Sequence, residues 1–145
     1  MANAPLKDIQ NNILNRLRTT ITLLPNNAID LFPDPPNKVQ VTHPVGNVLL
    51  HYSGAAFDKP REYYNMTQQG LQSWIVTIVG VSIRDNKSAL DLIDAVYDSL
   101  TGYSPYSHDD TKNMYAVREG WMERNEKWWM YFIEFRVRRV REKYN

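Results

Sequence analysis

The chain has 145 residues, enough for one domain with a hydrophobic core, and its 43% hydrophobic and 23% charged content is that of an ordinary globular protein. The formal net charge is only +1, so any attraction to nucleic acid or to an acidic partner must come from local clusters of charge. The lack of cysteine excludes disulfides, thiolate metal sites and cysteine nucleophiles.

The N-terminal part of the chain predicts one amphipathic helix followed by a loop. Apolar residues recur at three- and four-residue steps from Leu6 to Leu24, and Pro5 suits a first helical turn. The segment 25–38 holds four of the eight prolines, which predicts a loop. The N-terminus lacks the apolar core of a signal peptide, and no run approaches the ~18 residues of a membrane span. We therefore expect synthesis in the cytosol and no membrane partner.

The middle of the chain predicts short strands, a long loop and one strongly apolar strand. Residues 38–42 and 47–52 read as two strands on either side of a turn, or as one strand after a loop, and 53–66 as an exposed loop. Apolar side chains occupy both faces of the strand expected over 72–83, so both faces should be covered. Two helices would cover one face, and a neighbouring subunit could cover the other. Gly80 permits a bulge or a close backbone approach.

The second half predicts a helix and then a strand pair. The helix is expected over 88–100, with Ser88 as its cap and Gly102 as its stop. A loop leads to a strand over 114–123, and a short turn joins it to the last strand, 128–141.

This element order indicates the fold class. Helix, three strands, helix and two strands, without regular βαβ alternation, predict an α+β fold. We expect a mainly antiparallel sheet with two α-helices packed on one face, in a single domain spanning 1–145.

The two faces of the last strand differ. Residues 129, 131, 133, 135 and 137 are all apolar and share one face, which predicts burial. The other face changes from aromatic residues to Glu134, Arg136 and Arg138. Such a basic strand end suits phosphate contacts, but the nearly neutral chain favours packing and protein contact.

The remaining polar residues do not form a recognisable catalytic or metal site. His43 and His51 are eight residues apart, which does not match a metal-ligand spacing, and the six glycines form no phosphate-binding loop. Paired aspartates such as Asp91 and Asp94 fit the solvated face of a helix. We expect no enzyme activity, no metal and no cofactor.

The segment 89–105, ALDLIDAVYDSLTGYSP, resembles the helix-and-stop segment of phage tail-terminator (tail-completion) proteins, most closely those of Mu-like and other contractile tails. In that family a loop follows, then a strand pair with a tryptophan and a strongly aromatic last strand. Trp121 and residues 128–136 occupy those places, and the N-terminal helix also fits.

This resemblance implies a structural virion protein without catalysis. Members of the family form hexameric rings that cap the head-proximal end of the tail tube, halt tube polymerisation and offer a surface to neck proteins. In contractile tails they also contact the sheath, and an equivalent cap of a phage-like injection device is a related possibility. The implied partners are the chain itself and the tube, sheath and neck proteins, with DNA passing through the ring only incidentally.

The residues assigned to subunit and partner contacts are aromatic, apolar or basic: Trp74, Val76, Ile78, Tyr63, Tyr64, Tyr103, Tyr106, Trp128, Arg136, Arg138, Arg139 and Arg141. Independently of the resemblance, the two apolar strands carry more apolar face than two helices should cover, which favours oligomerisation. The arginines are expected to project into a lumen or onto an adjacent ring, and the loops 54–66 and 103–112 to supply axial contacts. Two alternatives stay open: a nucleic-acid-binding accessory domain that uses the basic strand, and a head–tail connector, neck or baseplate component.

Overall fold

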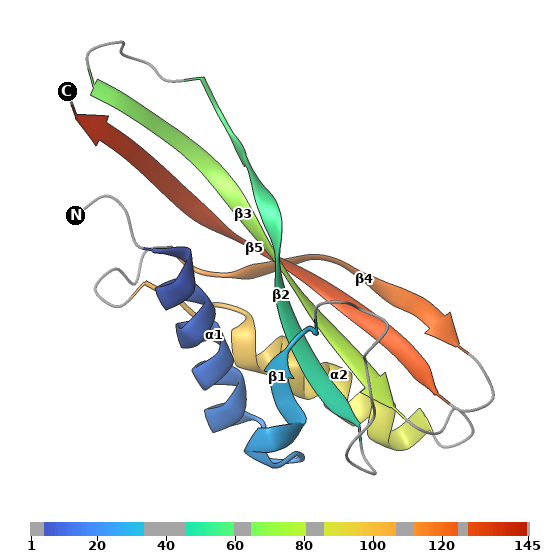
Figure 1. Cartoon of the computed structure of the whole chain (residues 1–145). Coiled ribbons are helices and arrows are strands. Elements are labelled where there is room, and N and C mark those ends of the chain that lie inside the picture. The colour runs from blue at the N-terminus through green and yellow to red at the C-terminus, as the bar shows by residue number, and fades with distance from the viewer. Residues whose placement is uncertain are drawn as a thin grey trace.

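A five-stranded sheet with two helices on one face makes up the fold (Figure 1). The computed structural model describes residues 5–33, 46–59, 65–80, 86–106, 112–124 and 128–144. The elements are α1 (Leu6–Thr20), the 3-10 helix η1 (Asn26–Ala28), β1 (Ile29–Leu31), β2 (Asn47–Phe57), β3 (Asn65–Gly80), α2 (Asn86–Leu100), β4 (Tyr115–Arg124) and β5 (Trp129–Tyr144). The strand order is β1-β2-β3-β5-β4, antiparallel except for the parallel pair β1–β2. The α+β class and the predicted element order are confirmed.

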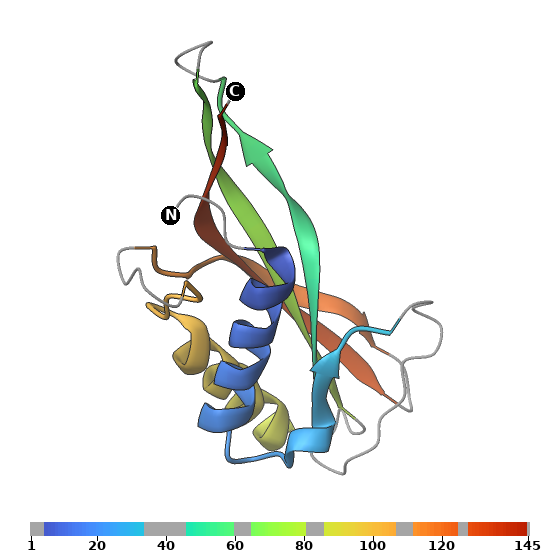
Figure 2. The ribbon, with the colours of Figure 1, turned by 60° about the vertical axis from the view of Figure 1, so that its left-hand side comes forward.

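Both helices bury an apolar stripe against the same side of the sheet, which we call the helix side (Figure 2). The buried stripe residues are Ile9, Ile13 and Leu17 of α1 and Leu92, Val96 and Leu100 of α2. A hydrogen bond connects the two helices: the Arg16 Nε donates to the Ser99 carbonyl at 2.9 Å. Gly102 adopts a φ of +80°, the left-handed conformation predicted for the residue that ends α2.

The core lies between the helices and the alternate residues of the central strands. Trp129, Ile133, Phe135 and Val137 of β5 are each at most 2% exposed, and Tyr131 packs against the same cluster. The predicted apolar face of the last strand is therefore confirmed. Gly80 pairs with Trp129, and a Cβ at this glycine would overlap the indole ring, so the close approach expected at Gly80 is confirmed too.

Beyond the helices, the three long strands continue as a twisted ribbon (Figures 1 and 2). We call this ribbon the arm and define it as residues 54–57 of β2, 65–71 of β3 and 138–144 of β5. β1 pairs with β2 only as far as Leu50, and the β4–β5 ladder ends at the pair Tyr115–Arg136. Among the described strands, β2 and β5 therefore form the two edges of the arm.

The strands extend further than the sequence patterns indicated. Residues 53–57, predicted to be loop, continue β2, and β3 begins at Asn65 rather than at residue 72. The pairing from Asn65–Tyr144 onwards is uninterrupted, so backbone hydrogen bonds hold these small and polar residues in strands despite their weak apolar pattern.

Three other local predictions are wrong or fall outside the described residues. The proline-rich segment 25–38 contains η1 and the three-residue strand β1, whose side chains close the end of the core. Helix α2 begins at Asn86, so Ser88 lies inside its first turn and is not its cap. The predicted strand 38–42, the turn after it and residues 81–83 and 125–127 lie outside the described residues.

Candidate assembly surfaces

The arginines of the last strand divide between the two sides of the sheet. Arg136 and Arg138 share the parity of Glu134 and lie on the side opposite the helices, which we call the open side. Arg139 lies on the helix side, where its Nη1 donates to the Tyr52 hydroxyl at 3.3 Å. The structure therefore does not bring Arg138 and Arg139 to one face, because adjacent strand residues point to opposite faces. The side chain of Arg141 lies outside the described structure.

On the open side, Glu134 is a buried carboxylate held between two arginines. Only 5% of Glu134 is exposed. The Arg118 Nε donates to one carboxylate oxygen at 2.8 Å, and the Arg136 Nε lies 3.3 Å from the other. The hydrogen bond from Arg118 holds the pKa of Glu134 below its ordinary value, against the opposing effect of burial. These two contacts hold Arg118 and Arg136 in place near the start of the arm.

Glu134→Gln is expected to lower the free energy of unfolding by about 1 kcal/mol at pH 7, since the arginines lose a charged partner but stay partly hydrated. Because the folded pKa is lowered, the carboxylate stabilises the fold above the unfolded pKa of about 4.3 and stops doing so as the pH falls through the folded value. Urea denaturation from pH 7 to pH 2.5 should show a difference between wild type and variant that is constant above the unfolded pKa and shrinks as the pH falls below it. Glu123→Gln, at an exposed position of β4, is the control. A difference that does not change with pH would contradict the assignment.

Tyr103 and Tyr106, two of the aromatic residues predicted to contact partners, connect elements of the chain itself. The Tyr106 hydroxyl accepts from the Gln72 Nε2 at 2.7 Å and donates to the Arg138 carbonyl at 2.9 Å. Tyr103 donates to the Asn12 carbonyl at 3.3 Å, and the Arg16 guanidinium lies 5.1 Å from its ring centroid. These contacts bind the loop after α2 to α1 and to the base of the arm.

The three β3 residues assigned to a subunit interface lie in the core instead. Trp74, Val76 and Ile78 are each at most 1% exposed and face the helices. Their assignment to an interface is corrected for a physical reason: the helices cover this parity of β3, which leaves the opposite parity for any partner. Tyr63 and Tyr64 lie outside the described residues.

Some side chains on the open side of the sheet are also covered by other parts of the same chain. A second apolar cluster on the open side joins Leu49, Val79 and Met130, with Phe32 and Trp128 packed against it. Nearby, the rings of Phe32 and His51 are in tilted contact with centroids 5.3 Å apart, and burial lowers the pKa of His51. Trp128, predicted to be a partner contact, is thus partly used inside the chain.

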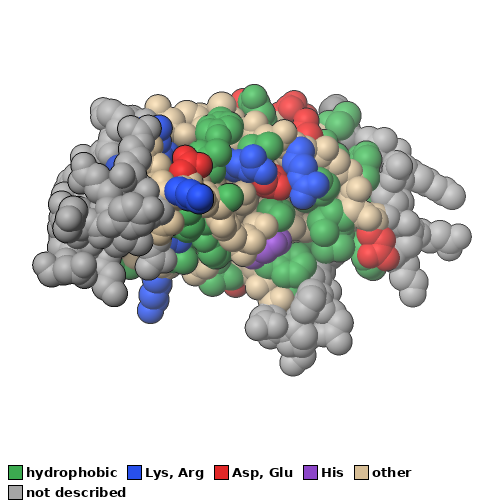
Figure 3. All heavy atoms as spheres, turned by 90° about the horizontal axis from the view of Figure 1, so that it is seen from above, with side chains coloured by type: hydrophobic (Ala, Val, Ile, Leu, Met, Phe, Trp, Pro, Cys, Tyr) green, Lys and Arg blue, Asp and Glu red, His purple; other side chains and the backbone are tan. Residues whose placement is uncertain are grey.

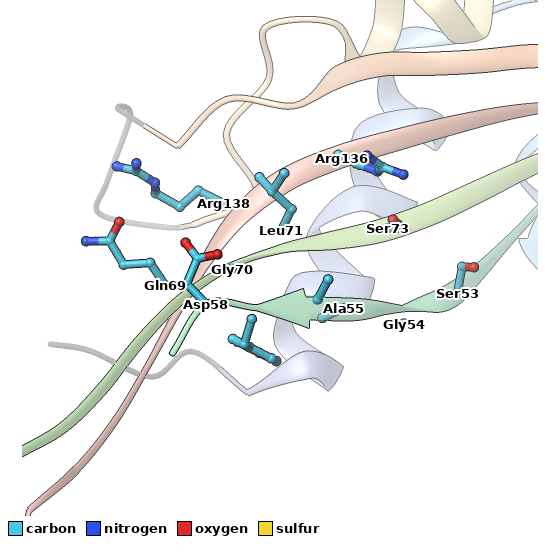
Figure 4. Close-up of a pocket in the computed structure, with 12 residues that line it drawn as sticks. Ser53, Gly54, Ala55, Asp58, Gln69, Gly70, Leu71, Ser73, Arg136 and Arg138 are labelled. Carbon is cyan, nitrogen blue, oxygen red and sulfur yellow. The ribbon is translucent and has the colours of Figure 1, made fainter. Parts of the chain in front are cut away.

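Further along the open side, towards the arm, the sheet is hollowed (Figure 4). The hollow has a volume of about 620 Å³. Small residues on neighbouring strands, among them Gly54, Ala56 and Gly70, line it together with Leu71, Arg136 and Arg138. The hollow exists because small side chains stand where the rest of the sheet carries large ones.

The outer strand β4 presents an apolar edge. β5 is the only neighbour of β4 among the described strands. Tyr115, Val117, Trp121 and Met122 are between 38% and 52% exposed. Trp121 makes edge-on contacts with Trp129 and Tyr131, at centroid distances of 5.6 and 4.9 Å. A long exposed strand edge with apolar side chains is a common site of pairing with another chain.

Charged side chains of both signs are mixed on one face of the molecule, and the described residues hold no cluster of metal-binding groups. On the face seen from above, basic side chains are interspersed with acidic and hydrophobic ones (Figure 3). Within the described residues, no group of three or more His, Cys, Asp or Glu could hold a metal ion. In the same part of the chain, no helix is long and apolar enough to cross a membrane.

Sequence reasoning missed several residues of these surfaces. Arg118 was not singled out, because its partnership with Glu134 depends on the β4–β5 register. Leu71 lies in a segment without a strong apolar pattern, yet it is exposed beside the hollow. The placement of the arginines on two faces could have been predicted, because adjacent strand residues such as Arg138 and Arg139 point to opposite faces of a sheet.

Comparison with known proteins gives the family. The family described as Gp37 protein matches residues 13–141, from within α1 to near the end of β5. None of the curated proteins compared with the chain matches it. The match therefore covers β1, β2, β3, α2 and β4 in full, together with α1 from residue 13 and β5 as far as residue 141. It confirms the phage origin implied by the sequence resemblance, and the chain belongs to the Gp37 protein family, a family of phage proteins.

Proposed function

We propose that the chain is a tail terminator, a structural protein that forms a ring, hexameric by the resemblance, at the head-proximal end of the phage tail tube. The ring stops polymerisation of the tube and sheath and presents a surface to the neck proteins. Assembly would take place in the host cytoplasm and leave the protein in the virion. This role needs contact surfaces and no catalytic group.

The observation that carries the proposal is the set of exposed strand edges, the β4 edge being apolar, on a chain of a phage family. β4 exposes Tyr115, Trp121 and Met122 along a strand with one described neighbour. The arm adds two further edges beyond the helices. Edges of this kind favour side-by-side packing of subunits or stacking on another ring of strands.

The test is termination of tube growth. Tail-tube protein from the same phage is polymerised with and without the purified chain, and tube lengths are measured by electron microscopy. We expect shorter tubes with a ring at one end only, in proportion to the chain added. Met122→Asp should weaken this effect by placing a charge on the exposed β4 edge, whereas Thr19→Asp, at an exposed position of α1, should not.

Two results would argue for other roles. Tubes of unchanged length, with no density at their ends, would contradict the terminator role and favour a connector, neck or baseplate component. Salt-sensitive retention of the wild-type chain on DNA would favour the nucleic-acid alternative. Against that alternative, Arg136 is engaged with Glu134, and Arg139 contacts Tyr52 on the other side of the sheet.

A further inference from the structure

The outward face of α2 is acidic and partly apolar. Asp91, Asp94 and Asp98 are all exposed, and Lys87 is the only basic residue of the helix. Leu90 and Tyr97 are 56% and 44% exposed and lie two helical turns apart. An exposed helix stripe that mixes carboxylates with large apolar side chains is suited to contact with a basic, partly apolar surface.

The hollow on the open side of the sheet is such a surface. Arg138 and Arg136, the latter also in contact with Glu134, contribute its basic groups, and Leu71, 37% exposed, contributes an apolar one. Figure 4 shows Leu71 lying between the two arginines. Among the described residues of the lining, Asp58 is the one acidic residue. Further out, the β5 part of the arm has four basic residues and one acidic residue in sequence, while its β2 and β3 parts have none of either.

The spacing of charges on the two surfaces agrees. Asp94 and Asp98 are separated by about 6 Å along a helix axis, at about 1.5 Å per residue. Arg136 and Arg138 are separated by about 6.6 Å along a strand, at about 3.3 Å per residue. The hollow, at about 620 Å³, has room for the side chains of one or two helical turns. We propose that α2 of one subunit docks into the hollow of a second copy of this chain.

The placement of the two surfaces determines the kind of assembly. α2 covers the helix side of the sheet and the hollow lies on the open side, so one chain cannot satisfy both surfaces by itself. Each subunit gives its helix to one neighbour and its hollow to the next. Such a head-to-tail contact generates a ring when the rotation between subunits closes. The inference thus rests on the ring of the proposed function and specifies which surfaces meet in it.

Charge reversal tests the contact. Asp94→Arg and Arg138→Asp, each alone, should raise the dissociation constant of self-association at least tenfold, because each places like charges opposite one another. The double variant should bring it back to within about threefold of wild type, since the reversed pair attracts again. Asp8→Arg on the exposed N-terminal turn of α1 is the control. Sedimentation velocity gives the constants, and circular dichroism checks that each variant is folded.

Disulfide trapping tests the same contact without requiring strong association. The chain has no cysteine, so each introduced thiol is unique. Under mild oxidation at high concentration, a chain with Asp94→Cys should cross-link to a differently tagged chain with Arg138→Cys at least tenfold faster than one with Asn11→Cys on α1. Cross-linking demands Cα atoms within about 7 Å, which only a docked helix provides.

The two experiments separate this inference from the terminator role. Equal cross-linking rates for the two pairs, or single reversals without effect on a chain that self-associates, would overturn the α2 contact. If such variants still terminate tubes, the function stands and the ring uses other surfaces. If the reversals behave as expected but tubes grow unchecked, the contact stands and the terminator role fails.

Discussion

Replacing Trp74 with alanine is expected to lower the free energy of unfolding by about 3–5 kcal/mol, the range for removing a large aromatic side chain from a core. The indole is 1% exposed, and its ring centroid lies 5.0 Å from that of Tyr52. Its Nε1 donates to the Gln72 Oε1 at 2.8 Å, inside a network that continues to Tyr106. Alanine would leave a cavity and remove the partner of a buried amide oxygen.

Trp74→Phe is the matched control for this prediction. Phenylalanine keeps an aromatic ring in the core but cannot donate to Gln72, so a smaller loss of about 1–2 kcal/mol is expected. Urea denaturation followed by far-ultraviolet circular dichroism measures both variants. An interface position would give the opposite pattern, with monomer stability nearly unchanged and assembly lost. A loss below about 1 kcal/mol for Trp74→Ala would thus restore the interface assignment of this residue.

Gly80→Ala should destabilise the chain by about 1–3 kcal/mol although it adds a single methyl group. The new Cβ would overlap the six-membered ring and the Nε1 side of Trp129. Trp129 is 2% exposed and is held by an edge-on contact with Trp121. The indole must therefore shift into a packed environment, and the cost should approach the upper end of the range.

Gly120→Ala separates this steric effect from a general effect of removing glycine. A Cβ at Gly120 would lie 3.6 Å from the nearest atom of Phe132, an ordinary van der Waals contact. Its expected effect is within about 0.5 kcal/mol of zero, since alanine also reduces the freedom of the unfolded chain. Thermal unfolding of the two variants should give clearly different midpoints. Similar midpoints would mean that the Gly80–Trp129 approach does not constrain the fold.

The sequence was informative wherever burial produced a periodic pattern. The stripes of α1 and α2 and the apolar parity of β5 each follow from one face packing on a core. Gly102 and Gly80 were also interpretable, because a left-handed helix end and a close approach both require glycine. These elements account for the α+β class and for the side of the sheet that the helices cover.

The arm could not be predicted in the same way. Residues 53–57 and 65–71 bury few apolar side chains, so nothing in their composition distinguishes a strand from a polar loop. Their structure comes from backbone pairing with residues distant in the chain. β1 was missed for a related reason, since three residues in a proline-rich segment are too short to show a period.

For the candidate surfaces, the residue types were predictable but their neighbours were not. The basic end of β5 was recognised from its composition, whereas the hollow requires β2, β3 and β5 to be placed side by side. The apolar pattern of β3 correctly indicated that Trp74, Val76 and Ile78 are buried. Periodicity alone cannot say whether a helix of the same chain or a second subunit covers a given face.

The strand order β1-β2-β3-β5-β4 has a consequence for the folding kinetics. β5 lies between β3 and β4, which both precede it in the chain. During synthesis, β5 can therefore join the sheet only after both of these strands have been synthesised. Asn65 pairs with Tyr144 and Gly80 with Trp129, contacts of high sequence separation whose loop closure is slow. Until β5 arrives, the inner edge of β3 stays exposed and the arm does not exist. The hollow is lined by β2, β3 and β5, so it forms only when this long-range pairing has been made.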